Sequence, residues 1–223
     1  MILCIADVIP ATDLAAIGRA LDKAVFQDGR KTAGWHARKV KRNEQADPAA
    51  RATQEIGARL TAALKANPVF SAGVQPRAIR PFLLSRYGEG MEYGPHVDDA
   101  IMGSEDRVRS DVSVTVFLSA PEDYDGGELV IESAGGEQAF KLPAGHAIAY
   151  PSTTLHRVEK VTRGTRLVAV TWVQSLVRSA DDREILFDLD QARRALFAQQ
   201  GKTREFDLIA KSYANLLRKW SEV

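Results

Sequence analysis

The sequence has few of the features that mark several large classes of protein. Its single cysteine, Cys4, excludes an internal disulfide framework and is typical of a reducing compartment, and we expect its side chain to be buried. No apolar run approaches the roughly 20 residues of a membrane-spanning helix. The net charge is +1, which favours neither nucleic acid nor membrane as a partner. Residues 1–10 lack the basic start of a signal peptide, so we expect a cytoplasmic protein.

The first part of the chain, residues 1–77, is predicted to be a helical and loop region packed on the core. Two apolar sets recur at helical spacing: Leu14, Ile17 and Leu21, then Ala52, Ile56, Leu60 and Leu64. Thr12 is expected to cap the first helix. Asp47-Pro48 is expected to start the second helix, and Asn67-Pro68 to end it. The polar and basic residues 28–47 lie between these helices and interrupt the pattern.

The central part, residues 78–174, changes to strand spacing. Apolar Val112, Val114 and Val116 alternate with Ser113 and Thr115, and glycine turns separate several more short strands. Short strands at this spacing favour an antiparallel sandwich or jelly roll over alternating strand–helix units. The predicted fold class is therefore mainly β with flanking helices (α+β).

The last part, residues 175–223, returns to helix. Ser179 and Thr203 are expected to cap two helices, and Gly201 to end the first of them. The second helix carries one apolar stripe: Phe206, Ile209, Tyr213, Leu216, Leu217 and Trp220. We expect this stripe to pack on the barrel. The other interpretation is a homo-oligomer whose subunits meet through the C-terminal helices.

The strongest chemical signal is the triplet His96-Val97-Asp98 followed by a distant His156. Two imidazoles and one carboxylate are the ligands that hold non-haem Fe(II) on one face and leave other positions open. Structural zinc would more commonly close its ligand shell with cysteines. Residues two apart in a strand share a face, so His96 and Asp98 can bind the same ion. Each histidine alone would be more simply interpreted as an unrelated surface residue.

Arg166 starts a strand pattern in which Val168, Val170 and Trp172 share its face. If those apolar side chains face the interior, the guanidinium does so as well. A buried guanidinium is costly without an anion beside it. Its partner is either an Asp or Glu of the protein or a dicarboxylate co-substrate held by both arms of the fork.

These residues carry a resemblance to a known family. The run from Tyr87 to Asp98, continued by Asp125-Gly126-Gly127-Glu128-Leu129, His156 and Arg166, resembles the prolyl 4-hydroxylase pattern of Fe(II)/2-oxoglutarate dioxygenases. The whole chain is similar to the bacterial PKHD-type hydroxylases, a branch linked to iron homeostasis.

The resemblance implies a double-stranded β-helix with Fe(II) held by His96, Asp98 and His156. It implies that 2-oxoglutarate chelates the iron, pairs its far carboxylate with Arg166 and receives a hydrogen bond from Tyr87. O₂ is the other implied co-substrate, and L-ascorbate (vitamin C) is implied as a reductant. The implied reaction hydroxylates a substrate and releases succinate and CO₂.

The resemblance does not choose the substrate, which could be a small molecule such as an iron chelator or a side chain of a protein. The alternative from another class is a non-catalytic jelly-roll protein that binds or senses iron, which would not need Arg166 or Tyr87. A third interpretation is a cupin-type oxygenase without 2-oxoglutarate. Such a site would more usually offer additional histidines and no inward arginine.

Residues 28–47 allow two interpretations. A basic run such as 38–42 is usually a solvated face. Alternatively the segment is a lid over the iron that carries Trp35 and His36, with Tyr93 also on the substrate side. Asp99 is expected to point away from the ligand pair, and His146 to lie on the surface.

Overall fold

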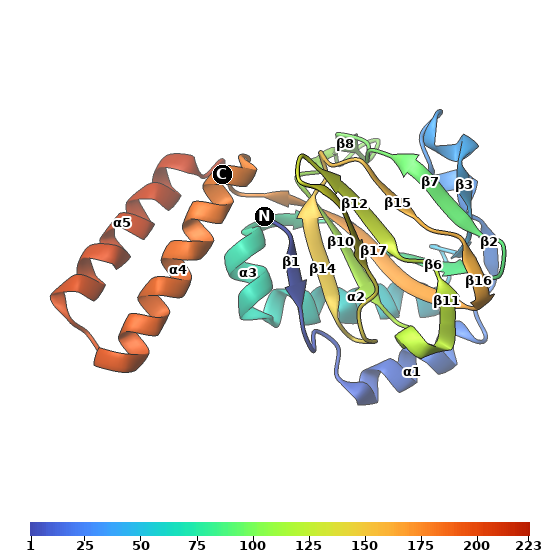
Figure 1. The fold of residues 1–223 in the computed structure, drawn as a ribbon, viewed down its shortest axis with the longest axis horizontal. Helices are drawn as coiled ribbons and strands as arrows, with labels where there is room; N and C mark the ends of the chain where they lie inside the picture. Colours follow the sequence, from blue (N-terminus) through green and yellow to red (C-terminus); the bar gives the residue numbers. More distant parts are fainter.

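Two antiparallel β-sheets lie face to face at the centre of the computed structural model, which describes residues 1–223 (Figure 1). The larger sheet has the order β1-β14-β10-β17-β6-β4-β2, formed by Leu3–Ile5, Ala147–Pro151, Val112–Phe117, Arg166–Ser175, Leu83–Tyr87, Glu44–Ala46 and Phe26–Asp28, and β5 (Pro76–Ile79) pairs with β17. The smaller sheet has the order β13-β12-β15-β7-β3, formed by Gly136–Phe140, Leu129–Ser133, His156–Val158, Glu92–His96 and Lys41–Arg42. The predicted double-stranded β-helix is confirmed.

Two short strand pairs complete the β structure. They are β8 with β9, formed by Ile101–Met102 and Val108–Arg109, and β11 with β16, formed by Tyr124–Gly126 and Val161–Gly164. A 3₁₀ turn, η3 (Pro121–Asp123), leads into β11. None of the helices is both long and apolar enough to cross a membrane.

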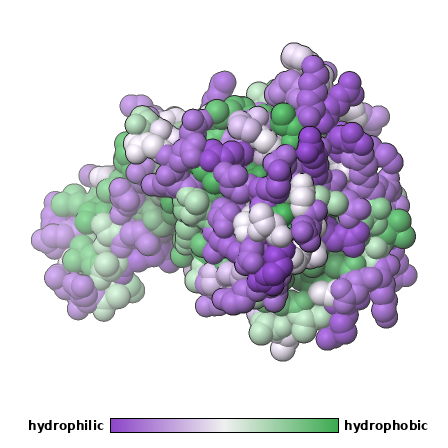
Figure 2. Space-filling model, turned by 45° about the vertical axis from the view of Figure 1, so that its right-hand side comes forward, coloured by the Kyte–Doolittle hydropathy of each residue, from purple (hydrophilic) through white to green (hydrophobic).

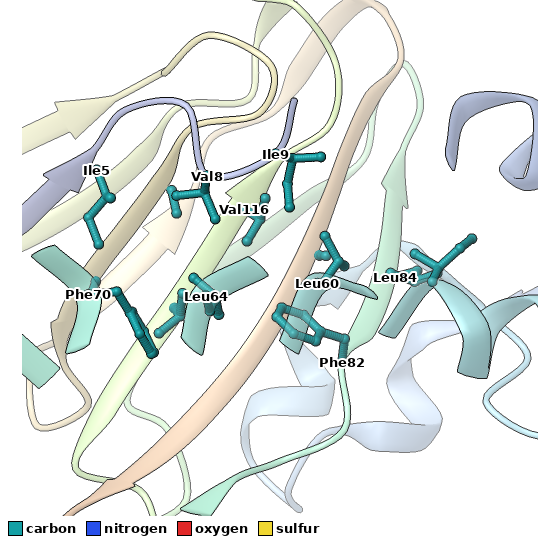
Figure 3. Close-up of a cluster of buried hydrophobic side chains, with 14 of the residues drawn as sticks. Ile5, Val8, Ile9, Leu60, Leu64, Phe70, Phe82, Leu84 and Val116 are labelled. Atoms are coloured by element: carbon teal, nitrogen blue, oxygen red, sulfur yellow. The ribbon is translucent and has the colours of Figure 1, made fainter. Parts of the chain in front are cut away.

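Three helices cover the outer face of the larger sheet: α1 (Ala11–Leu21), α2 (Arg51–Ala66) and α3 (Pro68–Val74). Their buried side chains meet those of the strands in one apolar cluster. In the view of Figure 3, Phe70, Leu64 and Phe82 form a row beneath Ile5 and its neighbours from the N-terminal segment. A second apolar cluster fills the space between the sheets. The helices therefore support the larger sheet from outside and leave its inner face for the site.

Helix starts in the first part differ from the prediction. Helix α1 begins after Pro10 without a side-chain cap, so Thr12 is not its cap. Helix α2 begins at Arg51, because the Asp47 carboxylate accepts from the backbone N–H of Ala49 and forms a turn first. Asn67 does end α2, and its side chain also caps α3 by accepting from two backbone N–H groups. Local propensity placed these helices correctly but not their first turns.

Two further expectations about burial are wrong. Thr53, not Ala52, is buried together with Ile56 on α2. Cys4 is exposed, because the alternation of β1 turns its neighbours Leu3 and Ile5 toward the protein and Cys4 away from it.

The segment 28–47 is folded rather than a solvated loop. It contains the 3₁₀ turns η1 (Gly29–Thr32) and η2 (Ala37–Lys39), and then β3 and β4. Strand β3 joins the smaller sheet and β4 joins the larger one. Lys41, Asn43 and Gln45 are buried, so the basic run 38–42 is not solvated throughout.

The C-terminal residues form a projecting helical hairpin of α4 (Ala180–Gln200) and α5 (Arg204–Trp220) (Figure 1). Ser179 and Thr203 cap these helices through their hydroxyls, and Gly201 ends α4, as predicted. Helix α5 packs mainly on α4, and the Tyr213 hydroxyl of its stripe also accepts a hydrogen bond from Gln75 at the end of α3, which corrects the expectation that the stripe packs on the barrel. The end of the chain returns to the barrel through an Arg109–Glu222 ion pair of 2.7 Å.

The helical hairpin shows apolar patches among polar ones (Figure 2). Phe197 is 51% exposed and Leu208 44%. A subunit interface at these helices stays a prediction, as does the division into units at 1–77, 78–174 and 175–223.

Candidate metal centre

The two histidines and the aspartate of the motif meet at the edge of the smaller sheet. His96 is the last residue of β7 and pairs in register with His156, the first residue of β15. Asp98 lies two residues beyond the end of β7, and its Oδ2 lies 3.8 Å from Nε2 of His156. One ligand atom from each of the three residues lies within 4.8 Å of the others. The residues could therefore bind one metal ion together.

Both imidazoles are oriented by the backbone. Nδ1 of His96 lies 2.9 Å from the carbonyl oxygen of Gly94, and Nδ1 of His156 lies 3.1 Å from that of Thr154. A carbonyl only accepts, so each Nδ1 carries the proton and each Nε2 offers a lone pair. Burial, and then the neighbouring His156, lower the pKa of His96 to about 4. The neutral form of His96, which is the form that binds metals, is thus present at neutral pH.

The three residues lie on the wall of a cavity of about 380 Å³ between the sheets. Arg166, Tyr87 and Trp172 line the same cavity from the larger sheet. A volume of this size is at the small end of ligand pockets in proteins. It suits a small co-substrate together with a small group of a second molecule.

Arg166 is 1% exposed, and its Nε and Nη1 have no hydrogen-bond partner in the protein. Its guanidinium carbon lies 5.0 Å from the ring centroid of Tyr87 and 5.7 Å from that of Phe117. No carboxylate oxygen lies within 4.0 Å of the Arg166 guanidinium. The alternative that its partner is an Asp or Glu of the protein is therefore wrong. A buried cation with unused donors is suited to an anion that enters the cavity.

The structure brings only one of the three predicted substrate-side residues to the cavity. Tyr93 lines the cavity and stacks on His96, with ring centroids 3.6 Å apart. Trp35 is 73% exposed, and its ring contacts that of His36, which is also exposed. Neither of these two lines the cavity; other residues of their segment do, among them Thr32 and Gly34. The segment therefore reaches the cavity, but not through Trp35 and His36.

Asp99 lines the cavity, contrary to the expectation that it points away. The alternation argument fails there because β7 ends at His96, three residues earlier. His146 is half-buried and lies away from the cavity, with Nε2 3.5 Å from the carboxylate of Asp7.

Sequence reasoning missed a polar wall formed by β3, β4 and η1. Nζ of Lys41 donates to Oγ1 of Thr32 at 3.1 Å, and Thr32 donates to Oε1 of Gln45 at 2.6 Å. Gln45 in turn donates to Oγ of Ser85 at 3.3 Å. The amide of Asn43 is buried in the same wall without a hydrogen-bond partner. The period-two spacing of residues 41, 43 and 45 was the available signal of a strand-like segment.

Comparisons with known proteins show the family and the fold of this chain. Residues 82–174 match the family model of the 2OG-Fe(II) oxygenase superfamily, and residues 181–222 match that of the PKHD-type hydroxylase C-terminal domain. A PKHD-type hydroxylase of Acaryochloris marina is 58% identical over 222 residues, and one of Gloeothece citriformis is 57% identical over 222 residues. Both alignments cover 100% of this chain and 100% of the relative.

Solved structures show the same fold at lower identity. A prolyl hydroxylase from Trichoplax adhaerens, solved in complex with a hypoxia inducible factor peptide fragment, is 13% identical with a TM-score of 0.60. That alignment covers 83% of this chain and 86% of the other. A Pseudomonas putida prolyl-4-hydroxylase is 23% identical with a TM-score of 0.53, covering 78% and 92%.

The donor set of two imidazoles and one carboxylate, with an unpartnered guanidinium in the same cavity, fits Fe(II) and 2-oxoglutarate, the groups after which the matched superfamily is named. The relatives match along their whole length at more than half identity. This chain therefore belongs to the PKHD-type hydroxylases, within the 2OG-Fe(II) oxygenase superfamily, and is a dioxygenase of the oxidoreductase class.

Proposed function

We propose that this protein uses O₂ and 2-oxoglutarate to hydroxylate a carbon of a small molecule or a protein side chain, with release of succinate and CO₂. The observation that carries the proposal is the buried Arg166, whose Nε and Nη1 have no partner, in the same cavity as the His96–Asp98–His156 cluster. A metal site and an anion site facing one small cavity are what a metal-chelating dicarboxylate requires.

His96, Asp98 and His156 would hold Fe(II) through their free Nε2 atoms and a carboxylate oxygen. Bound iron supplies the activation of O₂ that organic side chains cannot provide. The part of the chain is to orient both imidazoles through the carbonyls of Gly94 and Thr154, which leaves each Nε2 free to bind the metal.

Arg166 would bind the far carboxylate of 2-oxoglutarate with its planar fork. Tyr87 lies beside it, is 3% exposed, and would donate a hydrogen bond to the same carboxylate. Burial raises the pKa of the Tyr87 hydroxyl, and the nearby Arg166 acts against this effect. The hydroxyl is therefore protonated at neutral pH and able to donate.

Several finer assignments belong to the same proposal. L-ascorbate would serve as reductant, and we assign no residue to it. The cytoplasm is the proposed compartment, and iron homeostasis the proposed biological context. The alternative of a non-catalytic iron-binding or iron-sensing protein gives no reason to bury Arg166 without a partner. A cupin-type site gains no support, because the cluster has two histidines and one carboxylate.

The test is an anaerobic titration of the Fe(II)-loaded protein with 2-oxoglutarate, followed by the weak visible metal-to-ligand charge-transfer band. We expect the band in the wild type, and a shift to about tenfold or higher 2-oxoglutarate concentration in Arg166→Ala, because charged hydrogen bonds are lost. Arg163→Ala, at an exposed arginine, is the matched control and should titrate like the wild type. A protein that binds iron but shows no band would contradict the proposal.

A further inference from the structure

A second cation faces the cavity, on the opposite sheet from Arg166. Lys41 belongs to β3 of the smaller sheet and is 5% exposed. Its register partner is Tyr93 of β7, so the two side chains lie on one face of the sheet. Nζ lies 5.1 Å from the centroid of the Tyr93 ring, and that ring stacks on His96. The ammonium group thus lies one aromatic ring away from the proposed metal centre.

The protein gives this ammonium group little compensation. Its one hydrogen bond goes to the hydroxyl of Thr32, which is uncharged. No carboxylate oxygen lies within 4.0 Å of Nζ, and Asp98 and Asp28 act on it only from farther away. Burial lowers the pKa of Lys41 to about 8, which reflects the cost of holding a charge there. A purely structural role in the Thr32–Gln45 network would need only a neutral donor.

The proposed cofactor and co-substrate do not neutralise Lys41. The charges of Fe(II) and Arg166 are balanced by the Asp98 carboxylate and the two carboxylates of 2-oxoglutarate. At the cavity wall, Arg80 and Asp99 also carry opposite charges. Lys41 then remains as a positive charge of the cavity wall that no negative group balances. A loaded site would therefore still attract one negative group.

We propose that Lys41 binds a carboxylate of the primary substrate and so selects small acids, or peptides through a terminal carboxylate, for hydroxylation at the metal centre. This inference rests on the proposed function and names its substrate class. The small cavity and the depth of Nζ favour a short acid whose carboxylate reaches Lys41 while an adjoining carbon faces the metal. The unpartnered amide of Asn43 offers a further donor and acceptor on the same wall. Lys41 would thus be a specificity-determining residue.

The test measures binding to the protein loaded with Zn(II), a redox-inert substitute for Fe(II), and saturated with 2-oxoglutarate. The probes are N-acetyl amino acids, each compared by calorimetry with its primary amide, which has the same shape without the charge. We expect at least one acid to bind about tenfold or more tightly than its amide. Lys41→Met should remove this preference, and Lys41→Arg should retain part of it. Lys39→Met, an exposed lysine in the same segment, should retain all of it.

The failures are distinguishable. If the Zn(II)-loaded wild type does not bind 2-oxoglutarate, the proposed function fails. If it binds 2-oxoglutarate but no acid is preferred over its amide, or if the preference survives in Lys41→Met, the inference about Lys41 is overturned. If Lys41→Met loses as much affinity for 2-oxoglutarate as it loses for the acid, the inference is also overturned, because Lys41 would then serve the co-substrate.

A last comparison separates the two sources of a carboxylate. The acid that binds most tightly is compared with a tripeptide that ends in the same residue. Tighter binding of the free acid supports a small-molecule substrate, and tighter binding of the tripeptide supports a peptide terminus.

Discussion

The hydroxyl of Ser113 donates a hydrogen bond of 2.5 Å to Oδ2 of Asp98 and lies 2.7 Å from the hydroxyl of Ser152. Ser113 is fully buried on β10 of the larger sheet, whereas Asp98 follows β7 of the smaller one. The bond therefore crosses between the sheets and orients the carboxylate of the proposed metal centre.

Ser113→Ala should weaken metal binding without removing a ligand. Partners of this kind typically contribute about 10- to 100-fold to metal affinity, because they fix the orientation of the ligand. Competition with a chromogenic chelator for Zn(II) measures the change. Ser133→Ala, at an exposed serine in the β12–β13 hairpin, is the control. Equal affinity in Ser113→Ala and the wild type would show that Asp98 needs no such support.

Gly127→Ala should displace Arg166. A Cβ at Gly127 would lie 3.0 Å from Cδ of Arg166 and equally close to Cγ2 of Val161, and the backbone there has φ +68°. We expect a loss of about 1–3 kcal/mol of stability from the backbone strain, together with weaker binding of 2-oxoglutarate. Gly136→Ala separates the two effects, because φ is +108° there but a Cβ would meet open space. If both variants bind 2-oxoglutarate equally well, Gly127 does not position Arg166.

The stability cost of Lys41 should depend on pH. Its pKa falls from 10.5 to about 8 in the folded protein, mainly through burial, so the unfolded chain binds more protons between these values. The cost is present in full below pH 8 and is relieved as the pH rises toward 10.5. The free energy of unfolding of the wild type, relative to Lys41→Met, should therefore rise by about 3 kcal/mol over that interval.

Urea denaturation of both proteins at pH 7 and pH 10 measures this difference, and the other titrating groups cancel in the comparison. Lys39→Met should show little dependence on pH relative to the wild type. A constant difference between the wild type and Lys41→Met would mean that Lys41 holds its charge in the fold without cost.

Metal ions should stabilise the folded protein through the three clustered residues. At a free concentration of 100 times Kd, binding adds about 2.7 kcal/mol to the free energy of unfolding. Thermal unfolding with and without Zn(II) should show this effect in the wild type and lose it in Asp98→Ala. Asp99→Ala is a stringent control, because Asp99 is the adjacent carboxylate on the same cavity but not in the cluster. A full effect in Asp98→Ala would remove Asp98 from the ligand set.

The sequence was sufficient to predict the sheets, the tail helices and the clustered residues. The face shared by Arg166, Val168 and Trp172 follows from the two-residue period of a strand, which tertiary contacts do not alter. The caps Ser179 and Thr203 were likewise local signals. Such features depend on neighbouring residues in the chain and can be inferred from it.

Other features depend on partners far away in the sequence. Lys41 is buried because β3 pairs with β7, a pairing that two residues of strand cannot reveal in the sequence. The apolar stripe of α5 predicted that the helix has a partner, but the period of a stripe does not say which surface it contacts. Trp35 lies outside the cavity although neighbouring residues line it. The sequence pattern predicted that these segments make contacts more reliably than it predicted which surfaces they contact.

The short run from β3 to β4 has a mechanical consequence. Within six residues the chain pairs first with β7 of one sheet and then with β6 of the other, turning at the buried Asn43. Residues 41–46, which we call the clasp, therefore link the two sheets along one side of the barrel. Widening the barrel on that side would break backbone pairing on both sheets at once. The clasp thereby keeps Lys41 and Gln45 at a fixed separation on the cavity wall.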